Sequence, residues 1–267
     1  MNSSRQKLLP FFTFITGLLC PCAGRAAESA SPILPAQLAS RLATLQEDGS
    51  SYVRLRMQIN GATQDTFQLQ IKSRRTAGSS EIVYQVLWPV PQKGEAVLLR
   101  QTANHAPTGV TFNTKDGVRP LRDLKEPLLG SDLACADVIE NFFAWKEQAI
   151  LGGEDLAGVK CQILESKPGK GDHSIYGSVR SWIDAQRLVP MRVEKYSTSG
   201  QMVRRIDTTR VVTDGAKHIP ADLVVHGQRG ETSTVLAGSR IKHDVAYTNT
   251  DFSEDGLREL GAPHGGE

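Results

Sequence analysis

The chain has 267 residues, 39% of them hydrophobic and 22% charged, which is the composition of an ordinary globular protein and excludes a disordered one. The formal net charge is +2, but residues 1–26 hold three of the 31 basic residues and no acid, so 28 basic residues face 29 acidic ones beyond them. This balance excludes a nucleic-acid-binding protein that depends on a global basic field. We therefore expect no nucleic acid among the partners.

The first 26 residues have the order of a secretory signal peptide. Arg5 and Lys7 precede an apolar run over 8–19, and small residues follow it. The run is shorter than the about 20 residues that a membrane-spanning helix needs. We predict a signal peptide over 1–26, a leader over 27–34, and export of the chain.

Two cysteines near the cleavage region raise the alternative of a lipid anchor. Bacterial lipid attachment uses a cysteine that follows a small residue, whereas Leu19 precedes Cys20 and Pro21 precedes Cys22. Ordinary cleavage near 24–27 is therefore favoured over a lipid-anchored form.

A short helix and a β-hairpin are predicted next. Pro35 suits a first helical turn and leucines follow at helical spacing, so we expect a helix over 35–47. Two strands follow, joined by the turn signal Asn60-Gly61. Their apolar residues alternate and share one face: Val53, Leu55, Met57, Ile59, Phe67, Leu69 and Ile71. Three more strands are expected over 81–88, 96–102 and 108–113.

A second helix is expected to interrupt the strands. Ser131-Asp132 offers an N-cap, and apolar residues recur at helical spacing over 133–145. Phe142 and Phe143 lie on this apolar stripe and are candidate lid residues over the sheet.

The strands then resume and complete one domain. We expect strands over 159–166, 175–184, 191–196, 202–213, 218–226 and 232–247, separated by Gly and Pro turn signals. No break in composition separates the two halves, so we predict one domain over 35–260 and a flexible tail over 261–267. The fold class is mainly β with two or more helices: a single curved antiparallel sheet, an unclosed barrel of about eleven strands, with a helical lid or plug.

The meander over 175–196 supplies a second set of candidate ligand-facing residues. Alternation puts Ile175, Val179, Ile183, Met191 and Val193 on one face, although the pattern does not fix which way this face points. Together with the seven apolar residues of the first hairpin they are our candidates for a lipid-facing wall. Glu194 lies beside Arg192 and Lys195 in the sequence, and we interpret these three as a solvated charged face.

Cys135 and Cys161 are the two cysteines beyond the signal peptide. In an oxidising compartment such a pair favours a disulfide, which closes a loop of roughly 25 residues and contributes on the order of 3 kcal/mol. The alternative is two buried thiols. A metal or redox site is not predicted, because neither Cys-x-x-Cys nor a Cys/His ligand quartet is present.

No motif in the sequence indicates an enzyme. Ser239 and Lys242 match Ser-x-x-Lys but lie in a strand pattern, whereas that motif needs a helix to bring the two side chains together. His226 could approach His243 across a hairpin, but a metal site needs three or four converging ligands, and the six histidines are interpreted as surface or rim residues. We predict no catalytic residue, no metal site and no cofactor.

Several short motifs follow one another in the second half of the chain. They are Tyr176-x-x-Val179-x-x-Trp182-Ile183-Asp184, the run Val189-Pro190-Met191-Arg192-Val193-Glu194-Lys195-Tyr196, Gly200, Ile219-Pro220, Thr234-Val235-Leu236, Asn249-x-x-Phe252 and Leu257. Ahead of them, Gly130-Ser131-Asp132 leads to Asp137, Phe143 and Trp145. With these motifs, residues 128–258 resemble the LolA-like family of bacterial outer-membrane lipoprotein-sorting proteins, and the first half is similar in pattern.

The resemblance implies an unclosed β-barrel in the periplasm, with helices forming a lid over a hydrophobic cavity. Such a cavity holds lipid acyl chains or a lipoprotein, and it implies a membrane protein as donor or acceptor. The chain departs from the family at Ala134-Cys135, where an aromatic residue is common. The lid-binding arginine of the carrier does not match any single one of Arg54, Arg56, Arg74 and Arg75.

Three functions are compatible with the sequence, in order of preference. The first is a non-enzymatic periplasmic protein that binds lipid or lipoprotein, in outer-membrane lipoprotein sorting or acyl-chain carriage. The second is an envelope regulatory or structural protein on the same fold, with a cavity that is packed shut. The third, a lipid hydrolase, is motivated by cavity and compartment alone. The sequence leaves the identity of the ligand and the oligomeric state open.

Overall fold

The computed structural model describes residues 34–47, 49–103, 105–227 and 230–261, which belong to one compact unit, Ile33–Glu267. The predicted signal peptide, the leader up to residue 33 and the tail from residue 262 lie outside the described residues.

The described residues form thirteen strands and seven helices. The strands are β1 (Gly49–Asn60), β2 (Gln64–Thr76), β3 (Ser79–Trp88), β4 (Ala96–Thr102), β5 (Thr108–Asn113), β6 (Gly117–Pro120), β7 (Glu147–Leu156), β8 (Val159–Lys167), β9 (Ser178–Asp184), β10 (Val189–Tyr196), β11 (Met202–Asp214), β12 (Lys217–Gly227) and β13 (Ser233–His243). The α-helices are α1 (Pro35–Gln46), α2 (Cys135–Ile139) and α3 (Glu254–Gly261), and the short 3-10 helices are η1 (Val90–Gln92), η2 (Leu128–Gly130), η3 (Phe142–Ala144) and η4 (Thr250–Phe252).

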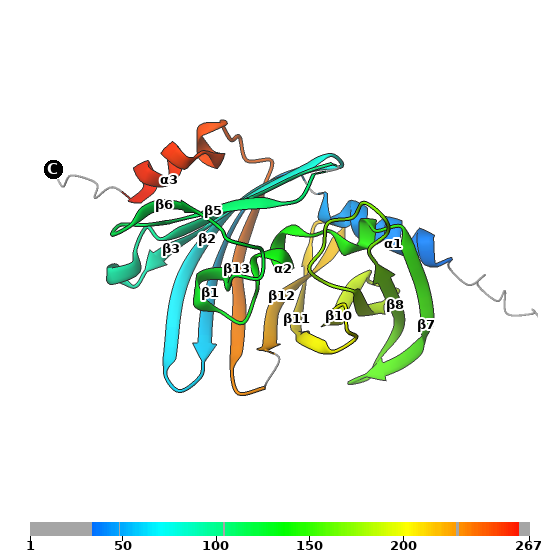
Figure 1. Cartoon of the computed structure of the whole chain (residues 1–267). Helices are drawn as coiled ribbons and strands as arrows, with labels where there is room; N and C mark the ends of the chain where they lie inside the picture. The colour runs from blue at the N-terminus through cyan, green and yellow to red at the C-terminus, as the bar shows by residue number, and fades with distance from the viewer. Residues whose placement is uncertain (1–33, 48, 104, 228–229, 262–267) are drawn as a thin grey trace, which may run out of the picture. The chain divides into compact units, whose positions relative to one another are not determined.

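All thirteen strands belong to one antiparallel sheet (Figure 1). Their order is β6-β5-β4-β3-β2-β1-β13-β12-β11-β10-β9-β8-β7, so the first and last strands pair in the middle and β6 and β7 form the two edges. Because the two edges do not pair with each other, the sheet is an unclosed barrel. The predicted fold class is therefore confirmed.

The two strands beyond the expected eleven are the edge strands, and each lacks the pattern that sequence reasoning uses. β6 has four residues. β7 is largely exposed and contains Gly152-Gly153, with a register shift between Ile150 and Gly152 against β8. A mostly exposed strand with two central glycines shows no apolar alternation, so its sequence resembles a loop.

The first hairpin forms as the alternation predicts. β1 and β2 pair in continuous register from Gly49 opposite Arg75 to Asn60 opposite Gln64. Met57 and Leu69 are buried on the same face of the two strands, because side chains at even spacing along a strand point to the same side.

The second predicted helix is shorter than expected and begins later. α2 covers Cys135–Ile139, the backbone of Glu140 is extended, and the separate 3-10 helix η3 follows. The Asp137 carboxylate, rather than Ser131-Asp132, caps the helix by accepting the N–H of Ala134 at 2.7 Å. Asp132 instead accepts hydrogen bonds from the hydroxyl groups of Thr232 and Thr234 and so joins this segment to β13. The prediction of one helix over 133–145 was wrong in this respect.

The two faces of the sheet are covered by different parts of the chain. We call the face that packs against α1, α2 and η3 the inner face. The opposite, outer face of β3 to β6 carries a separate cluster in which Val83 and Leu98 pack with Phe252 and Leu257 of the C-terminal segment. α3 contacts β5 and β6, and sequence reasoning did not predict this helix (Figure 1).

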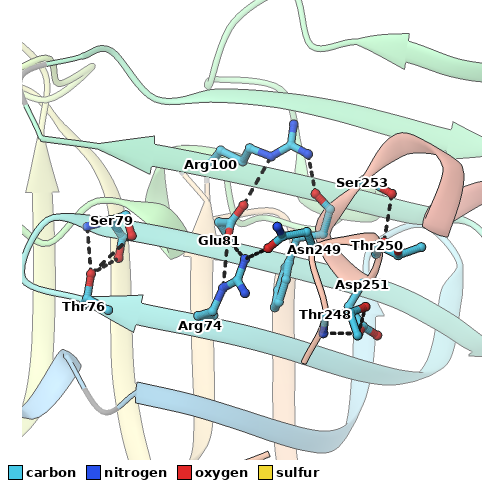
Figure 2. A network of polar contacts seen from close by, with 11 residues as sticks. Arg74, Thr76, Ser79, Glu81, Arg100, Thr248, Asn249, Thr250, Asp251 and Ser253 are labelled. Carbon is cyan, nitrogen blue, oxygen red and sulfur yellow. Dashed lines mark hydrogen bonds and ion pairs between the residues drawn. The ribbon is translucent and has the colours of Figure 1, made fainter. Parts of the chain in front are cut away.

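Polar contacts hold the C-terminal segment on the outer face (Figure 2). Glu81 of β3 accepts a hydrogen bond from Arg74 Nε at 3.0 Å and pairs with Arg100 Nε at 3.6 Å. Arg74 also donates to Asn249 Oδ1 at 3.3 Å, and Arg100 donates to the carbonyl of Phe252. The motif Asn249-x-x-Phe252 thus supplies an acceptor and a ring that anchor the end of the chain.

The predicted disulfide between Cys135 and Cys161 is not formed. Both cysteines are free and buried. Cys135 lies on α2, within the apolar cluster of Ile82 and Val97, whereas Cys161 lies on β8 opposite Asp184. Burial raises the pKa of both thiols, that of Cys135 to about 12, so both are inert thiols rather than a bridge. An even number of cysteines in a chain expected to be exported suggested a bridge, but the two residues lie on different elements, where each is buried as a free thiol.

Candidate functional site

Helix α1 and η3 cover the inner face over β8 to β11. Leu38 and Leu42 of α1 pack into one cluster with Phe142 and Phe143 of η3 and with the strand residues beneath them. The two phenylalanine rings lie 4.4 Å apart between centroids. The predicted lid residues are therefore buried parts of this cover.

Helix α2 covers the inner face over β3 and β4. Cys135 and Ile139 pack with Ile82, Val97 and Leu99 of the two strands. α2 is one turn and a half long, so this cover depends on tertiary contacts and not on helix propensity.

A third apolar cluster lies on the inner face at β1, β2 and β3. Its buried centre is formed by Met57, Leu69 and Val86, and the half-buried side chains Leu55, Ile59, Phe67, Leu129 and Leu236 surround it. We call these eight residues the β1–β2 patch. Leu129 has a φ of 50°, in the left-handed region, which a leucine adopts only where the surrounding contacts hold it.

A pocket of about 490 Å³ opens beside β5 and the edge strand β6. Its walls come from residues 106–109, 120–124 and 173–175, and its apolar side chains are Ala106, Pro107, Pro120, Leu121, Leu124 and Ile175. We call it the apolar pocket. Leu124 packs against the cluster under α1 and also against the cluster under α2, so the pocket reaches the junction of the two covers. Its volume lies within the range of about 300–1,000 Å³ that is typical of ligand pockets.

The candidate lipid-facing residues occupy different environments. Those of the first hairpin lie on the inner face: Met57 and Leu69 are buried, and Val53, Leu55, Ile59, Phe67 and Ile71 are half-buried. Of the second set, Val179, Ile183 and Val193 are buried in the cluster with α1. Ile175 lies before β9 and lines the apolar pocket. Met191 lies where the register of β10 shifts and is half-buried.

A buried charge network connects α2 to β10 and β11. The Asp137 side chain is fully buried, and its Oδ1 lies 2.8 Å from Lys195 Nζ, while its Oδ2 pairs with Arg204 Nη1. Tyr176 Oη donates to Asp137 Oδ1 at 2.6 Å. The Lys195 ammonium also lies over the rings of Phe142, at 5.3 Å, and Tyr176, at 4.8 Å. We call Asp137, Tyr176, Lys195 and Arg204 the Asp137 network.

The cations of this network keep Asp137 ionised. Burial alone raises the pKa of a carboxyl, but Lys195 and Arg204 outweigh it, and the pKa of Asp137 lies below its usual value. Burial, together with the Asp137 carboxylate, raises the pKa of the Tyr176 hydroxyl far above its usual value, so this hydroxyl stays a donor. The network is therefore a permanent ionic link between α2 and the sheet.

Sequence reasoning missed this link because it grouped Lys195 with Arg192 and Glu194. The interpretation of all three as a solvated charged face was wrong, since Lys195 is 1% exposed. Alternation gives the correct face: Lys195 lies two residues after Val193 and points with it to the inner side. The alternation along β10 therefore contained the information, but residues adjacent in the sequence were assigned to the same face of the strand.

The described residues contain no group of three or more His, Cys, Asp or Glu side chains placed to hold a metal ion. His226 and His243 pair with Asp207 and Asp214, and the register puts His226 opposite Ser233, away from His243. Within the part of the chain that the structure describes, no helix is long and apolar enough to cross a membrane.

Comparisons with known proteins place this fold. A family model described as uncharacterized proteins matches residues 83–259. A structure of a DUF1329 family protein from Desulfovibrio piger has a TM-score of 0.77 and 19% identity, covering 84% of this chain and 97% of that one. An outer membrane lipoprotein-sorting protein domain from Vibrio parahaemolyticus has a TM-score of 0.75 and 19% identity, with 84% and 98% covered. A LolA superfamily protein from Nitrosomonas europaea has a TM-score of 0.67 and 18% identity, with 84% and 100% covered. No curated protein matches the sequence.

The fold is that of the LolA-like class, an unclosed antiparallel sheet whose inner face is covered by helices. The resemblance predicted from the motifs of residues 128–258 is thereby confirmed. The chain belongs to the family of uncharacterized proteins that the matching model describes, and that match extends over both halves of the sheet, from β3 to α3.

Proposed function

We propose that this chain is a non-enzymatic lipid-binding protein of the periplasm that takes up acyl chains at the apolar pocket. The pocket carries the proposal, because it has ligand size, apolar walls and access to the junction between the two covers of the inner face. The β1–β2 patch supplies further half-buried apolar surface on the same face. The predicted signal peptide would deliver the chain to the periplasm.

The role we propose is acyl-chain carriage or lipoprotein sorting toward the outer membrane. One structural neighbour is named for outer membrane lipoprotein sorting and another for the LolA superfamily, which supports a role of this kind. In such a role the chain exchanges its cargo with a membrane protein as donor or acceptor. The ligand is an acyl chain of a lipid or of a lipoprotein.

A matched pair of isoleucines tests the apolar pocket. Ile175 and Ile150 are both half-buried and pack against the same cluster. Of these two residues, Ile175 lines the pocket and Ile150 does not. We expect purified protein to bind an apolar dye that fatty acid displaces, and Ile175→Gln to weaken dye binding at least tenfold. Ile150→Gln, with the same loss of apolar surface, is expected to change it less than threefold. Equal effects of the two substitutions, or no dye binding and no extractable lipid in the wild type, would contradict the proposal.

One observation favours the second function, an envelope regulatory or structural protein. Over β8 to β11 the inner face is filled, since Val179 and Ile183 are fully buried against the cover formed by α1 and η3. In a protein of this kind the cover does not open. Hydrogen exchange distinguishes the two: α1 amides that gain protection when lipid is added support carriage, and amides that do not respond support the regulatory or structural role.

A further inference from the structure

The turn between β3 and β4 exposes two large apolar side chains close together. Trp88 ends β3 with 48% of its surface exposed, and Val90 begins η1 with 76% exposed. The other two tryptophans, Trp145 and Trp182, are 8% and 7% exposed. Single exposed apolar residues are common on protein surfaces, whereas neighbouring large ones mark a contact site. We call residues 88–92 the β3–β4 tip.

The β3–β4 tip contains no charged residue and few free backbone donors. Its sequence is Trp-Pro-Val-Pro-Gln, and the two prolines have no N–H. The N–H of Gln92 donates to the carbonyl of Pro89 at 3.2 Å. The N–H of the next residue, Lys93, donates to the carbonyl of Val90, also at 3.2 Å. Insertion of the tip into an apolar layer therefore removes no charge from water and leaves few backbone donors without a partner.

The residues that follow the tip favour a surface that presents phosphate groups. Lys93 comes directly after the tip and is exposed. The long alkyl chain of a lysine can lie along apolar surface while its ammonium group stays at the polar boundary. The nearest acid along the chain, Glu95, is half-buried at the start of β4.

The size of the tip favours a bilayer over a protein partner. An aromatic side chain offers about 150–250 Å² of surface, so Trp88 and Val90 together expose on the order of 200 Å². A stable protein interface buries about 800 Å² on each partner. The interfacial layer of a bilayer needs no matching surface, and tryptophan is enriched there because its ring is apolar and its N–H is polar.

The tip adjoins the β1–β2 patch. Trp88 lies opposite Gln68 in the register of β2 and β3, and Val86 lies opposite Leu69. Val86 and Leu69 belong to the buried centre of the patch. An apolar chain that leaves a bilayer at the tip therefore meets apolar surface of this protein at once.

We propose that the β3–β4 tip docks this chain onto a lipid bilayer. Trp88 and Val90 enter the interfacial layer, and Lys93 lies at the level of the lipid phosphates. No residue of the tip lines the apolar pocket, so docking and acyl-chain binding can fail separately.

Sedimentation with vesicles of phosphatidylethanolamine and phosphatidylglycerol tests the docking. The protein is used from residue 27 on, because the apolar run of the predicted signal peptide would itself bind lipid, and this part contains the whole compact unit. We expect the wild type to sediment with the vesicles, and Trp88→Ser and Val90→Ser each to lower the partition coefficient at least fivefold. The control is Leu151→Ser on the edge strand β7, which is 49% exposed, with an expected change below twofold. Unfolding curves of the variants show that a lost signal is not a lost fold.

Tryptophan fluorescence locates the inserted residue. Because Trp145 and Trp182 are buried, iodide in solution quenches mainly Trp88. We expect vesicles to reduce this quenching at least twofold, and lipids brominated near the head-group end of their acyl chains to quench the same residue.

Three results would overturn the proposal: no wild-type protein in the vesicle pellet, equal partition of the wild type and both tip variants, or iodide quenching that vesicles do not change. Binding to membranes that contain protein, but not to pure lipid vesicles, would also overturn it and make the partner a membrane protein. Dye binding at the apolar pocket is expected to be the same in Trp88→Ser and in the wild type. Its loss together with vesicle binding would contradict a separate docking site.

Discussion

The buried carboxyl of Glu140 makes folding stability depend on pH. Burial raises the pKa of Glu140 from 4.5 to about 7, against the opposing effects of the Ser174 hydroxyl, the Lys195 ammonium and the N–H of Ile175. The Asp137 carboxylate adds to the increase. The folded state therefore holds this proton more tightly than the unfolded state does.

The sign and size of the effect follow from this difference. Below pH 4.5 the carboxyl is protonated in both states, and its full contribution to stability is present. As the pH rises through about 7, the folded carboxyl must ionise in a buried site, and that contribution is lost. At 1.36 kcal/mol for each pKa unit, the loss between pH 4.5 and pH 8 is about 3 kcal/mol.

Glu140→Gln isolates this contribution, because glutamine keeps the oxygen that accepts from Ser174 and does not ionise. Urea unfolding of wild type and variant at pH 5 and at pH 8 gives the difference in unfolding free energy at each pH. We expect the variant to gain about 3 kcal/mol relative to wild type between the two conditions. Other titrating groups cancel in this comparison. The same difference at both pH values would refute a buried, proton-holding carboxyl at Glu140.

Three further predictions concern the network, the patch and the C-terminal segment. Asp137→Asn leaves two cations of the Asp137 network without their carboxylate and should lower the unfolding free energy in urea by about 3–5 kcal/mol, and a loss below about 1 kcal/mol would contradict its role. Phe67→Glu should reduce lipid binding to the β1–β2 patch by at least tenfold in a dye assay, whereas Gln68→Glu, which faces the other side, should not. Gly256→Ala would put a Cβ 2.0 Å from a carbonyl oxygen of η4 and should lower the melting temperature, while Gly78→Ala meets no atom within 4 Å and should leave it unchanged.

The fold was predictable from the sequence where one face of a strand is apolar and the other polar. The alternation from Val53 to Ile71 predicted the first hairpin, because its inner side is buried and its outer side is wet. The edge strand β7 could not be predicted, since it is exposed around Gly152. α3 was missed for another reason: it is short, and its burial comes from the outer face of β3 to β6, which is distant in sequence.

The candidate site was predictable in part. Alternation along the strands predicted which residues lie on the inner face. It did not predict the helices that cover this face, because the residues that α1 contacts depend on the path of the whole sheet. Glu140 and Asn141 read as ordinary polar residues at the end of a helix. Their burial results from contacts with Ala43 and Ser174, which one sequence does not bring together. The expected disulfide was wrong because an even number of cysteines carries no information about which elements hold Cys135 and Cys161.

The order of the strands decides which part of the sheet can form first. Strands β1 to β6 pair with their neighbours in sequence, and so do β7 to β13, so each half grows by short-range contacts. The two halves are joined by the pairing of β1 with β13, which brings Ser51 opposite His243. During synthesis this central seam stays open until almost the whole chain is available, and β1 has until then an unpaired edge. A chain truncated before β13 therefore loses the strand pairing that joins the two halves of the sheet, and not only its C-terminal residues.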